Sequence, residues 1–238
     1  MKKNAWKHIR YLFDGRIEID EYKDGRYGAR GMKREKKKKA TPDQIKKQNR
    51  ANKVRKIRRY ILANFSPGDY WITLTCSRDH RPSDMKMAID QRKCFIDKLR
   101  KLFRKAGYEL KWMAVTERGS RGGVHHHLII NRIPNGDKMM KEAWPYGKVF
   151  MELLYDDEGF QKLAEYMVKQ TEEAAESKYS HSRNLIKPEP QVKYYKKPQK
   201  IKIPSGWYLE KESFVEGINP VTGFPYKHYA LVKVKKRE

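Results

Sequence analysis

Three consecutive histidines, His125, His126 and His127, stand inside the apolar segment 124–130. Side chains alternate across a β-strand, so His125 and His127 are expected on one face and His126 on the other. Two imidazoles at positions i and i+2 of a strand stand close enough to bind one cation, and neutral imidazole is a common metal ligand. This spacing therefore predicts a metal site on the face that carries His125 and His127.

Glu117 supplies a third ligand of the right kind from the preceding predicted strand. If Glu117 lies opposite His125, Val115 lies opposite His127, and the carboxylate shares the face of these two histidines. A site of two histidines and one carboxylate leaves coordination positions open, which suits Mn²⁺ or Mg²⁺ polarising a phosphate better than a structural zinc ion. The alternative is that the three histidines only form a basic surface patch.

Tyr166 and Lys169 form a second candidate pair within a predicted helix over residues 158–176. At positions i and i+3 they present a phenol and an ammonium group to the same side of the helix. A tyrosine can act as a covalent nucleophile, and a nearby cation favours the phenolate and the charge that develops on a phosphate. Taken alone, the pair is equally typical of a core tyrosine beside a surface lysine, and Tyr155 and Tyr179 flank the same helix.

The elements that would position these residues follow the order β-α-β-β-α-β with one further helix. An antiparallel sheet with helices on one face, the ferredoxin-like (split βαβ) arrangement of an α+β protein, is the expected fold. The expected strands cover residues 70–76, 110–117, 124–131 and 149–155, and the expected helices cover 83–103, 137–144 and 158–176.

The two ends of the chain lie outside this pattern. A hairpin over residues 1–30, with Asp24-Gly25 as its turn, and a helix from Thr41-Pro42 to Asn64 are predicted before the core. A Pro- and Lys-rich linker and an aromatic-rich segment follow it. We therefore expect three parts: a basic N-terminal hairpin and helix (1–65), an endonuclease core (66–180), and a linker with a C-terminal segment packed on the core (181–238).

The combined order of the motifs WITLTC, HHH and YMVK resembles that of the HUH endonucleases, which include rolling-circle replication initiators, conjugative relaxases and single-strand transposases. The resemblance covers about residues 69–176. The lysine block KREKKKK and the segment GINPVTGFPYKHY are similar to those in replication proteins of small plasmids and phages. One position departs from the family pattern, because His126 stands where a bulky apolar residue is usual.

This resemblance implies a function for each candidate residue. Glu117, His125 and His127 would hold the metal, Tyr166 would be the nucleophile, and Lys169 would assist it electrostatically. The implied reaction is nicking and rejoining of single-stranded or origin hairpin DNA through a 5′-phosphotyrosine intermediate, which starts rolling-circle replication. No GxxxxGK(S/T) loop occurs in the sequence, so a host helicase and polymerase are expected partners.

The charge of the chain also favours a nucleic-acid partner. The sequence has 55 Lys and Arg against 29 Asp and Glu, a net charge of +26, and residues 1–60 hold 22 basic and 7 acidic residues. Besides Arg118 and Arg121 in the turn between two strands, the expected DNA-contacting residues are Lys36, Lys37, Lys38 and Lys39. No apolar run reaches the length needed to span a bilayer, roughly 20 residues. We therefore expect a cytoplasmic protein without membrane partners or a small-molecule cofactor.

Three alternatives stay open at this stage. The first is a non-catalytic single-stranded nucleic-acid-binding protein, since basic, aromatic-rich sheets of this topology bind RNA by stacking. The second is a single-strand transposase of the same superfamily. The third is a metal-dependent nuclease that uses water, with Tyr166 in a structural position. A covalent protein–DNA adduct would separate the tyrosine enzymes from the other two.

Overall fold

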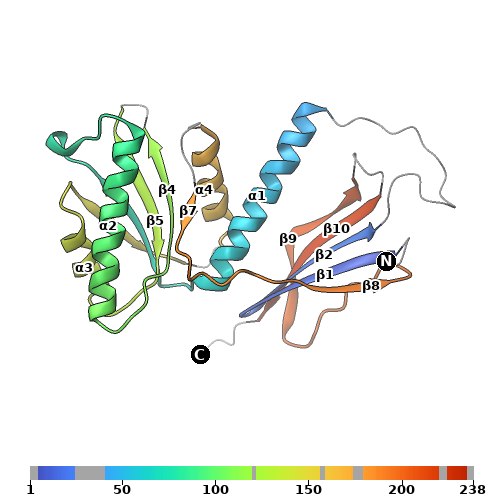
Figure 1. The fold of residues 1–238 in the computed structure, drawn as a ribbon. Helices are drawn as coiled ribbons and strands as arrows, with labels where there is room; N and C mark the ends of the chain where they lie inside the picture. Colours follow the sequence, from blue (N-terminus) through green and yellow to red (C-terminus); the bar gives the residue numbers. More distant parts are fainter. Residues whose placement is uncertain are drawn as a thin grey trace. The chain divides into compact units, whose positions relative to one another are not determined.

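The computed structural model describes residues 5–24, 41–119, 122–155, 159–173, 179–219 and 224–234. The chain divides into two compact units (Figure 1). One unit is continuous and holds residues 50–187, and the other combines residues 1–49 with residues 188–238. This division differs from the three consecutive parts expected from the sequence, because the two ends of the chain contribute strands to a single sheet.

The continuous unit contains a five-stranded antiparallel sheet with the strand order β6-β3-β5-β4-β7. Its first four strands have the order of the ferredoxin-like split βαβ fold, so the predicted α+β class is confirmed. The short strand β7 at the β4 edge was not predicted. The strands are β3 (Tyr70–Thr75), β4 (Trp112–Arg118), β5 (Val124–Ile130), β6 (Val149–Leu153) and β7 (Ser180–His181).

Helices cover both faces of this sheet, whereas helices on one face were expected. One hydrophobic cluster joins residues of β3, β4 and β5 to α2 (Met85–Lys105) and α3 (Gly136–Ala143). A second cluster joins the opposite face of β4 and β5 to α1 (Pro42–Asn64) and α4 (Gln161–Glu173). In Figure 1, α2 and α4 accordingly lie on opposite sides of β4 and β5. Each side chain of the central strands therefore has its face fixed by a packed core.

Strand pairing agrees with the predicted register. Glu117 lies opposite His125, and Val115 lies opposite His127. On the other side of β5, Thr75 is paired with His125 and Thr73 with His127. Because directly opposite residues in a sheet share a face, the three strands bring these side chains to the same surface.

Local hydrogen bonds define where two helices begin. The Thr41 hydroxyl accepts from the Gln44 amide at 3.2 Å, and the Gln44 side chain accepts from the Thr41 amide at 3.0 Å. This reciprocal pair is a capping box for α1. Helix α2 is capped by Asp84, whose carboxylate accepts from the Met87 amide at 2.7 Å. The predicted cap, Ser83, is one residue too early.

The second unit is a five-stranded antiparallel sheet with the order β8-β1-β2-β10-β9. The predicted N-terminal hairpin is present as β1 and β2, but its turn is Asp14-Gly15 and not Asp24-Gly25. Gly15 has a φ of 63°, which a glycine adopts without strain. The C-terminal segment pairs with this hairpin. The strands are β1 (Ala5–Phe13), β2 (Arg16–Asp24), β8 (Gln191–Tyr195), β9 (Trp207–Ile218) and β10 (Pro225–Lys233).

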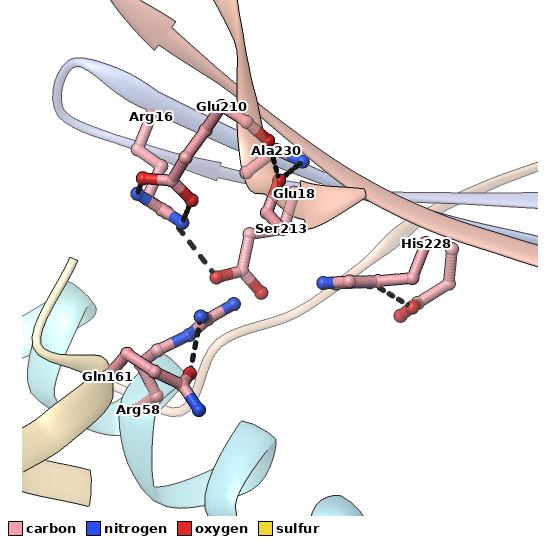
Figure 2. Close-up of polar contacts among 9 residues, drawn as sticks. Arg16, Glu18, Arg58, Gln161, Glu210, Ser213, His228 and Ala230 are labelled. Atoms are coloured by element: carbon pink, nitrogen blue, oxygen red, sulfur yellow. Dashed lines mark hydrogen bonds and ion pairs between the residues drawn. The ribbon is translucent and has the colours of Figure 1, made fainter. Parts of the chain in front are cut away.

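Buried ion pairs connect the N-terminal and C-terminal strands of this sheet. The Arg16 guanidinium donates to both carboxylate oxygens of Glu210, at 2.8 and 2.5 Å, and its Nε lies 3.5 Å from a Glu18 oxygen (Figure 2). The Ser213 hydroxyl donates to the Glu210 carbonyl and accepts from the Ala230 amide at a break in the β9–β10 register. Charge pairing therefore helps to hold β2 against strands that lie far later in the chain.

None of the helices in the described ranges is long and apolar enough to cross a membrane.

Candidate functional site

His127 is the centre of a polar cluster on the α1/α4 face of the sheet. Its Nε2 lies 3.0 Å from Glu117 Oε1 and 3.0 Å from the Tyr166 phenol oxygen. Its other ring nitrogen, Nδ1, lies 3.0 Å from the Thr73 hydroxyl. The structure thus brings one predicted histidine, the predicted carboxylate and the predicted tyrosine into direct contact.

The Thr73 hydroxyl can serve either tautomer of His127, because a hydroxyl both donates and accepts. With Nε2 protonated, His127 donates to Glu117, and Nδ1 accepts from Thr73. With Nδ1 protonated, His127 donates to Thr73, and the Nε2 lone pair faces Glu117 and Tyr166. The second arrangement is the one in which imidazole binds a metal ion.

Trp71 holds the orientation of both rings. Its indole is stacked on the His127 imidazole with ring centroids 5.6 Å apart and an interplanar angle of 13°. It also meets the Tyr166 ring edge-on, with centroids 5.8 Å apart and an angle of 87°. Trp71 comes from the strand next to His127, so the motif WITLT supplies packing as well as the Thr73 hydroxyl.

Burial keeps His127 in the neutral form. Desolvation lowers the pKa of His127, the hydrogen bond and charge of Glu117 act in the opposite direction, and the neighbouring His125 lowers it slightly. Because desolvation is the largest of these effects, the imidazole is unprotonated near neutral pH. Only this form can act as a metal ligand.

His125, the third predicted ligand, shares the face but not the hydrogen bonds. Its ring is stacked near that of His127, with centroids 6.4 Å apart and an angle of 23°. Its Nε2 is turned toward the loop after β4, since a Cβ atom built on Gly123 would lie 3.5 Å from it. Among the residues that the structure describes, no three His, Cys, Asp or Glu side chains stand in position to hold a metal ion. The donor types still fit a divalent cation: one carboxylate and two imidazoles, all on one face.

His126 points to the opposite face and is fully buried. Its Nδ1 lies 2.9 Å from the Thr116 hydroxyl, and that hydroxyl accepts from Arg92 at 2.7 Å. The hydroxyl proton is therefore directed to His126. Desolvation, followed by the charge of Arg92, lowers the pKa of His126 to about 3. The imidazole at the family's usual apolar position is thus a neutral core residue with a hydrogen-bond partner.

Helix α4 carries Tyr166 to the site because its opposite side is buried. Ala164, Met167 and Val168 are fully buried in the cluster shared with α1, β4 and β5. The guanidinium of Arg58 in α1 donates at 2.6 Å to Gln161 at the start of α4 (Figure 2). Lys169, predicted as the electrostatic helper of Tyr166, is exposed one turn further along α4.

The two rival tyrosines do not reach His127. Tyr155 follows β6 and is 75% exposed. Tyr179 packs with Tyr60 and His181, and burial raises the pKa of its phenol, which disfavours the nucleophilic phenolate. Of the predicted DNA-contacting residues, Arg118 is exposed at the end of β4. Arg121 and Lys36–Lys39 lie outside the described residues.

The comparison with known families covers this same unit. Residues 69–171 match the model of a replication-associated protein family named after ORF2. This segment belongs to that family. The match begins just before β3 and ends within α4, so it includes Thr73, the three histidines, Tyr166 and Lys169. It confirms the resemblance to rolling-circle replication initiators, and it is consistent with the wider HUH superfamily.

The family assignment places the chain among proteins of DNA replication, with a replication initiator as the indicated role. No curated protein and no solved structure matches the chain. The geometry of the site, together with the family, therefore carries the functional argument.

Sequence reasoning missed Thr73 and Trp71 as parts of the site. Both lie in the strand segment YWITLT, and they alternate with the buried residues Ile72 and Leu74. The signal was available, because period-2 alternation puts positions 71, 73 and 75 on the face opposite the α2/α3 core. What the sequence could not supply was the pairing of this strand with β5.

Proposed function

We propose that this protein is a metal-dependent single-strand DNA endonuclease and strand-joining enzyme that nicks a replication origin through Tyr166. The observation that carries the proposal is the contact of Tyr166 with His127 Nε2 at 3.0 Å, on the nitrogen that Glu117 also approaches at 3.0 Å. A phenol from a helix thus meets a histidine and a carboxylate from two strands, at the place where the family's nucleophile is expected. Rolling-circle initiation is the biological role that follows from this chemistry.

In the proposed reaction, the Tyr166 phenol loses its proton, and its oxygen forms a bond to the phosphorus of the scissile phosphodiester. The bond from phosphorus to the 3′ oxygen breaks, and that oxygen takes up a proton to become a free 3′ hydroxyl. The 5′ phosphate stays on Tyr166. Because a phosphotyrosine ester replaces a phosphodiester, the reverse attack by a 3′ hydroxyl rejoins strands without another energy source.

Glu117, His125 and His127 would hold the divalent ion, Mn²⁺ or Mg²⁺. When bound, the ion would supply charge stabilisation at the non-bridging phosphate oxygens. Trp71 fixes the relative orientation of the imidazole and the phenol, and Lys169 adds positive potential one helical turn away. Only one tyrosine of α4 takes part, so closing a circle requires a second subunit or the reuse of Tyr166.

The test is covalent attachment to single-stranded DNA from the replicon's own origin. The wild-type protein is expected to form an adduct that survives denaturing electrophoresis, to lose it with a chelator and to regain it with Mn²⁺ or Mg²⁺. Tyr166→Phe removes only the hydroxyl, so folding is retained and the adduct is lost. Tyr155→Phe is the matched control and keeps the adduct, because Tyr155 is exposed and distant from His127 in the contact network.

Mass spectrometry of the adduct peptide identifies the attached residue. A nucleotide on Tyr155 or Tyr179 would refute the assignment of Tyr166. Strand cleavage without any adduct would favour a nuclease that uses water. Tight DNA binding with neither cleavage nor adduct would favour a non-catalytic binding protein. Efficient joining of transposon ends in place of origin nicking would favour a single-strand transposase.

A further inference from the structure

Phe150 is an aromatic residue that the core of the protein does not account for. It lies in the middle of β6, an edge strand of the sheet, and its side chain is 56% exposed. Its neighbours Val149 and Met151 are partly buried and pack on the cluster formed with α2 and α3. Alternation along the strand therefore directs Phe150 to the other face of the sheet, the face of His127.

The register of the sheet places Phe150 in one row with the candidate site. Phe150 is paired with Thr73 in β3, and Thr73 is paired with His127 in β5. Adjacent strands lie about 4.8 Å apart, so Phe150 stands two spacings, about 10 Å, from His127 across the row. Thr73, which contacts His127 Nδ1, is the residue between them.

The charged residues beside Phe150 define a direction. Lys148 precedes it on the same face and is exposed, with its carbonyl accepting from the Thr75 amide at 3.0 Å. Glu152 follows on the same face and is also exposed. A phosphodiester backbone is attracted to the ammonium and repelled by the carboxylate, so a bound strand would run past Phe150 on the Lys148 side.

An exposed aromatic ring next to a cation is the combination by which proteins bind single-stranded nucleic acid. The ring offers a stacking surface that accepts any base, and the cation contacts the backbone. The net charge of +26 fits the same class of partner. A protein or membrane partner would not explain why the ring stands in the row of His127.

We propose that Phe150 stacks on the base of a nucleotide adjoining the scissile phosphate and that Lys148 contacts the backbone beside it. This inference rests on the proposed nicking activity, since it assigns the substrate subsite next to Tyr166 and His127. The edge strand β6 thus extends the site from the scissile phosphate to the flanking nucleotide. Stacking makes this subsite tolerant of base identity, so sequence selection must come from other contacts.

The experiment compares Phe150→Ala, Phe150→Trp and the matched control Leu153→Ala in the full-length protein. Leu153 is an apolar residue of the same strand with 47% exposure, but alternation puts it on the other face. The probe is a single-stranded oligonucleotide from the replicon's origin, with 2-aminopurine placed in turn at each position around the nick. Binding is measured by anisotropy and stacking by quenching of the 2-aminopurine fluorescence.

Phe150→Ala is expected to weaken binding by about 5- to 150-fold and to abolish the quenching at one position next to the nick. Phe150→Trp is expected to keep both, and Leu153→Ala is expected to match the wild type. Wild-type affinity and quenching in Phe150→Ala, with nicking intact, would overturn the subsite and leave the proposed function standing. Absence of a Tyr166 adduct in the wild type, with binding still weakened by Phe150→Ala, would instead refute the nicking function.

Discussion

Thr116→Val removes one hydroxyl from the buried chain that links Arg92, Thr116 and His126, while almost preserving side-chain volume. Thr116 is 1% exposed and His126 is fully buried, so water does not replace the lost partner. The Arg92 guanidinium loses an acceptor at 2.7 Å, and His126 Nδ1 loses a donor at 2.9 Å.

The expected cost follows from the two orphaned groups. A hydrogen bond from a charged donor contributes about 1.5–3 kcal/mol, and a buried acceptor left without a partner costs about 1–3 kcal/mol. Arg92 keeps its bond to the Ser180 hydroxyl, which limits the loss on that side. We therefore expect Thr116→Val to lower the free energy of unfolding by about 3 kcal/mol, a large part of the stability of an ordinary domain.

The assay is urea denaturation followed by the helical circular-dichroism signal, in the presence of a chelator to exclude metal effects. This signal reports on the 50–187 unit, where most of the helical residues lie. Thr75→Val is the matched control, because its hydroxyl donates only a long, exposed bond to Lys148 at 3.4 Å. The control is expected to change stability by less than about 0.5 kcal/mol.

A double mutant tests the cause. His126→Leu removes the acceptor, so adding it to Thr116→Val leaves only the Arg92 donor unsatisfied. The two substitutions should then be non-additive, with a coupling energy of about 1 kcal/mol or more. A cost below about 1 kcal/mol for Thr116→Val alone, or strict additivity in the double mutant, would refute the account of this buried chain.

Two further predictions concern metal binding and DNA binding. Thr73→Val removes the hydroxyl that orients His127 through Nδ1, so the affinity for Mn²⁺ measured by titration calorimetry should fall by about 10- to 100-fold; unchanged affinity would show that Thr73 does not position a ligand. Replacing Lys36–Lys39 by glutamine should flatten the slope of log affinity against log salt for single-stranded DNA by up to about 3, at about 0.7 per phosphate contact; an unchanged slope would mean that the lysine block does not contact the backbone. Substitution is the appropriate change here, because deleting residues 1–39 would also remove β1 and β2 from their sheet.

Alternation along single strands made part of the site predictable. Glu117, His125 and the strands that carry them could be placed on one face from the sequence, since period-2 patterning leaves only registers that differ by two. The contact between Tyr166 and His127 was implied by family resemblance, and it depends on α4 packing against a core that includes α1. The packing of Trp71 against these two rings depends on strand pairing, which no local pattern encodes.

Other features could not be predicted because the local chemistry is degenerate. The sequence offers Asp14-Gly15 and Asp24-Gly25 as equivalent turns, and the pairing of β1 with β2 selects the first. Ser83 and Asp84 are both good helix caps, and the hydrogen bond to Met87 selects the second. The sheet built from both chain ends was missed for a related reason, because its pairings join segments far apart in sequence.

That sheet imposes an order on how the protein is made. The hairpin of β1 and β2 leaves the ribosome first, but a two-stranded hairpin is marginally stable on its own. Its partners β8 and β10 are synthesised only after the whole 50–187 unit, which holds its own core and can fold in the meantime. The second unit is therefore completed only when translation has reached the last strand, so a chain that terminates early carries Tyr166 and His127 but lacks this sheet.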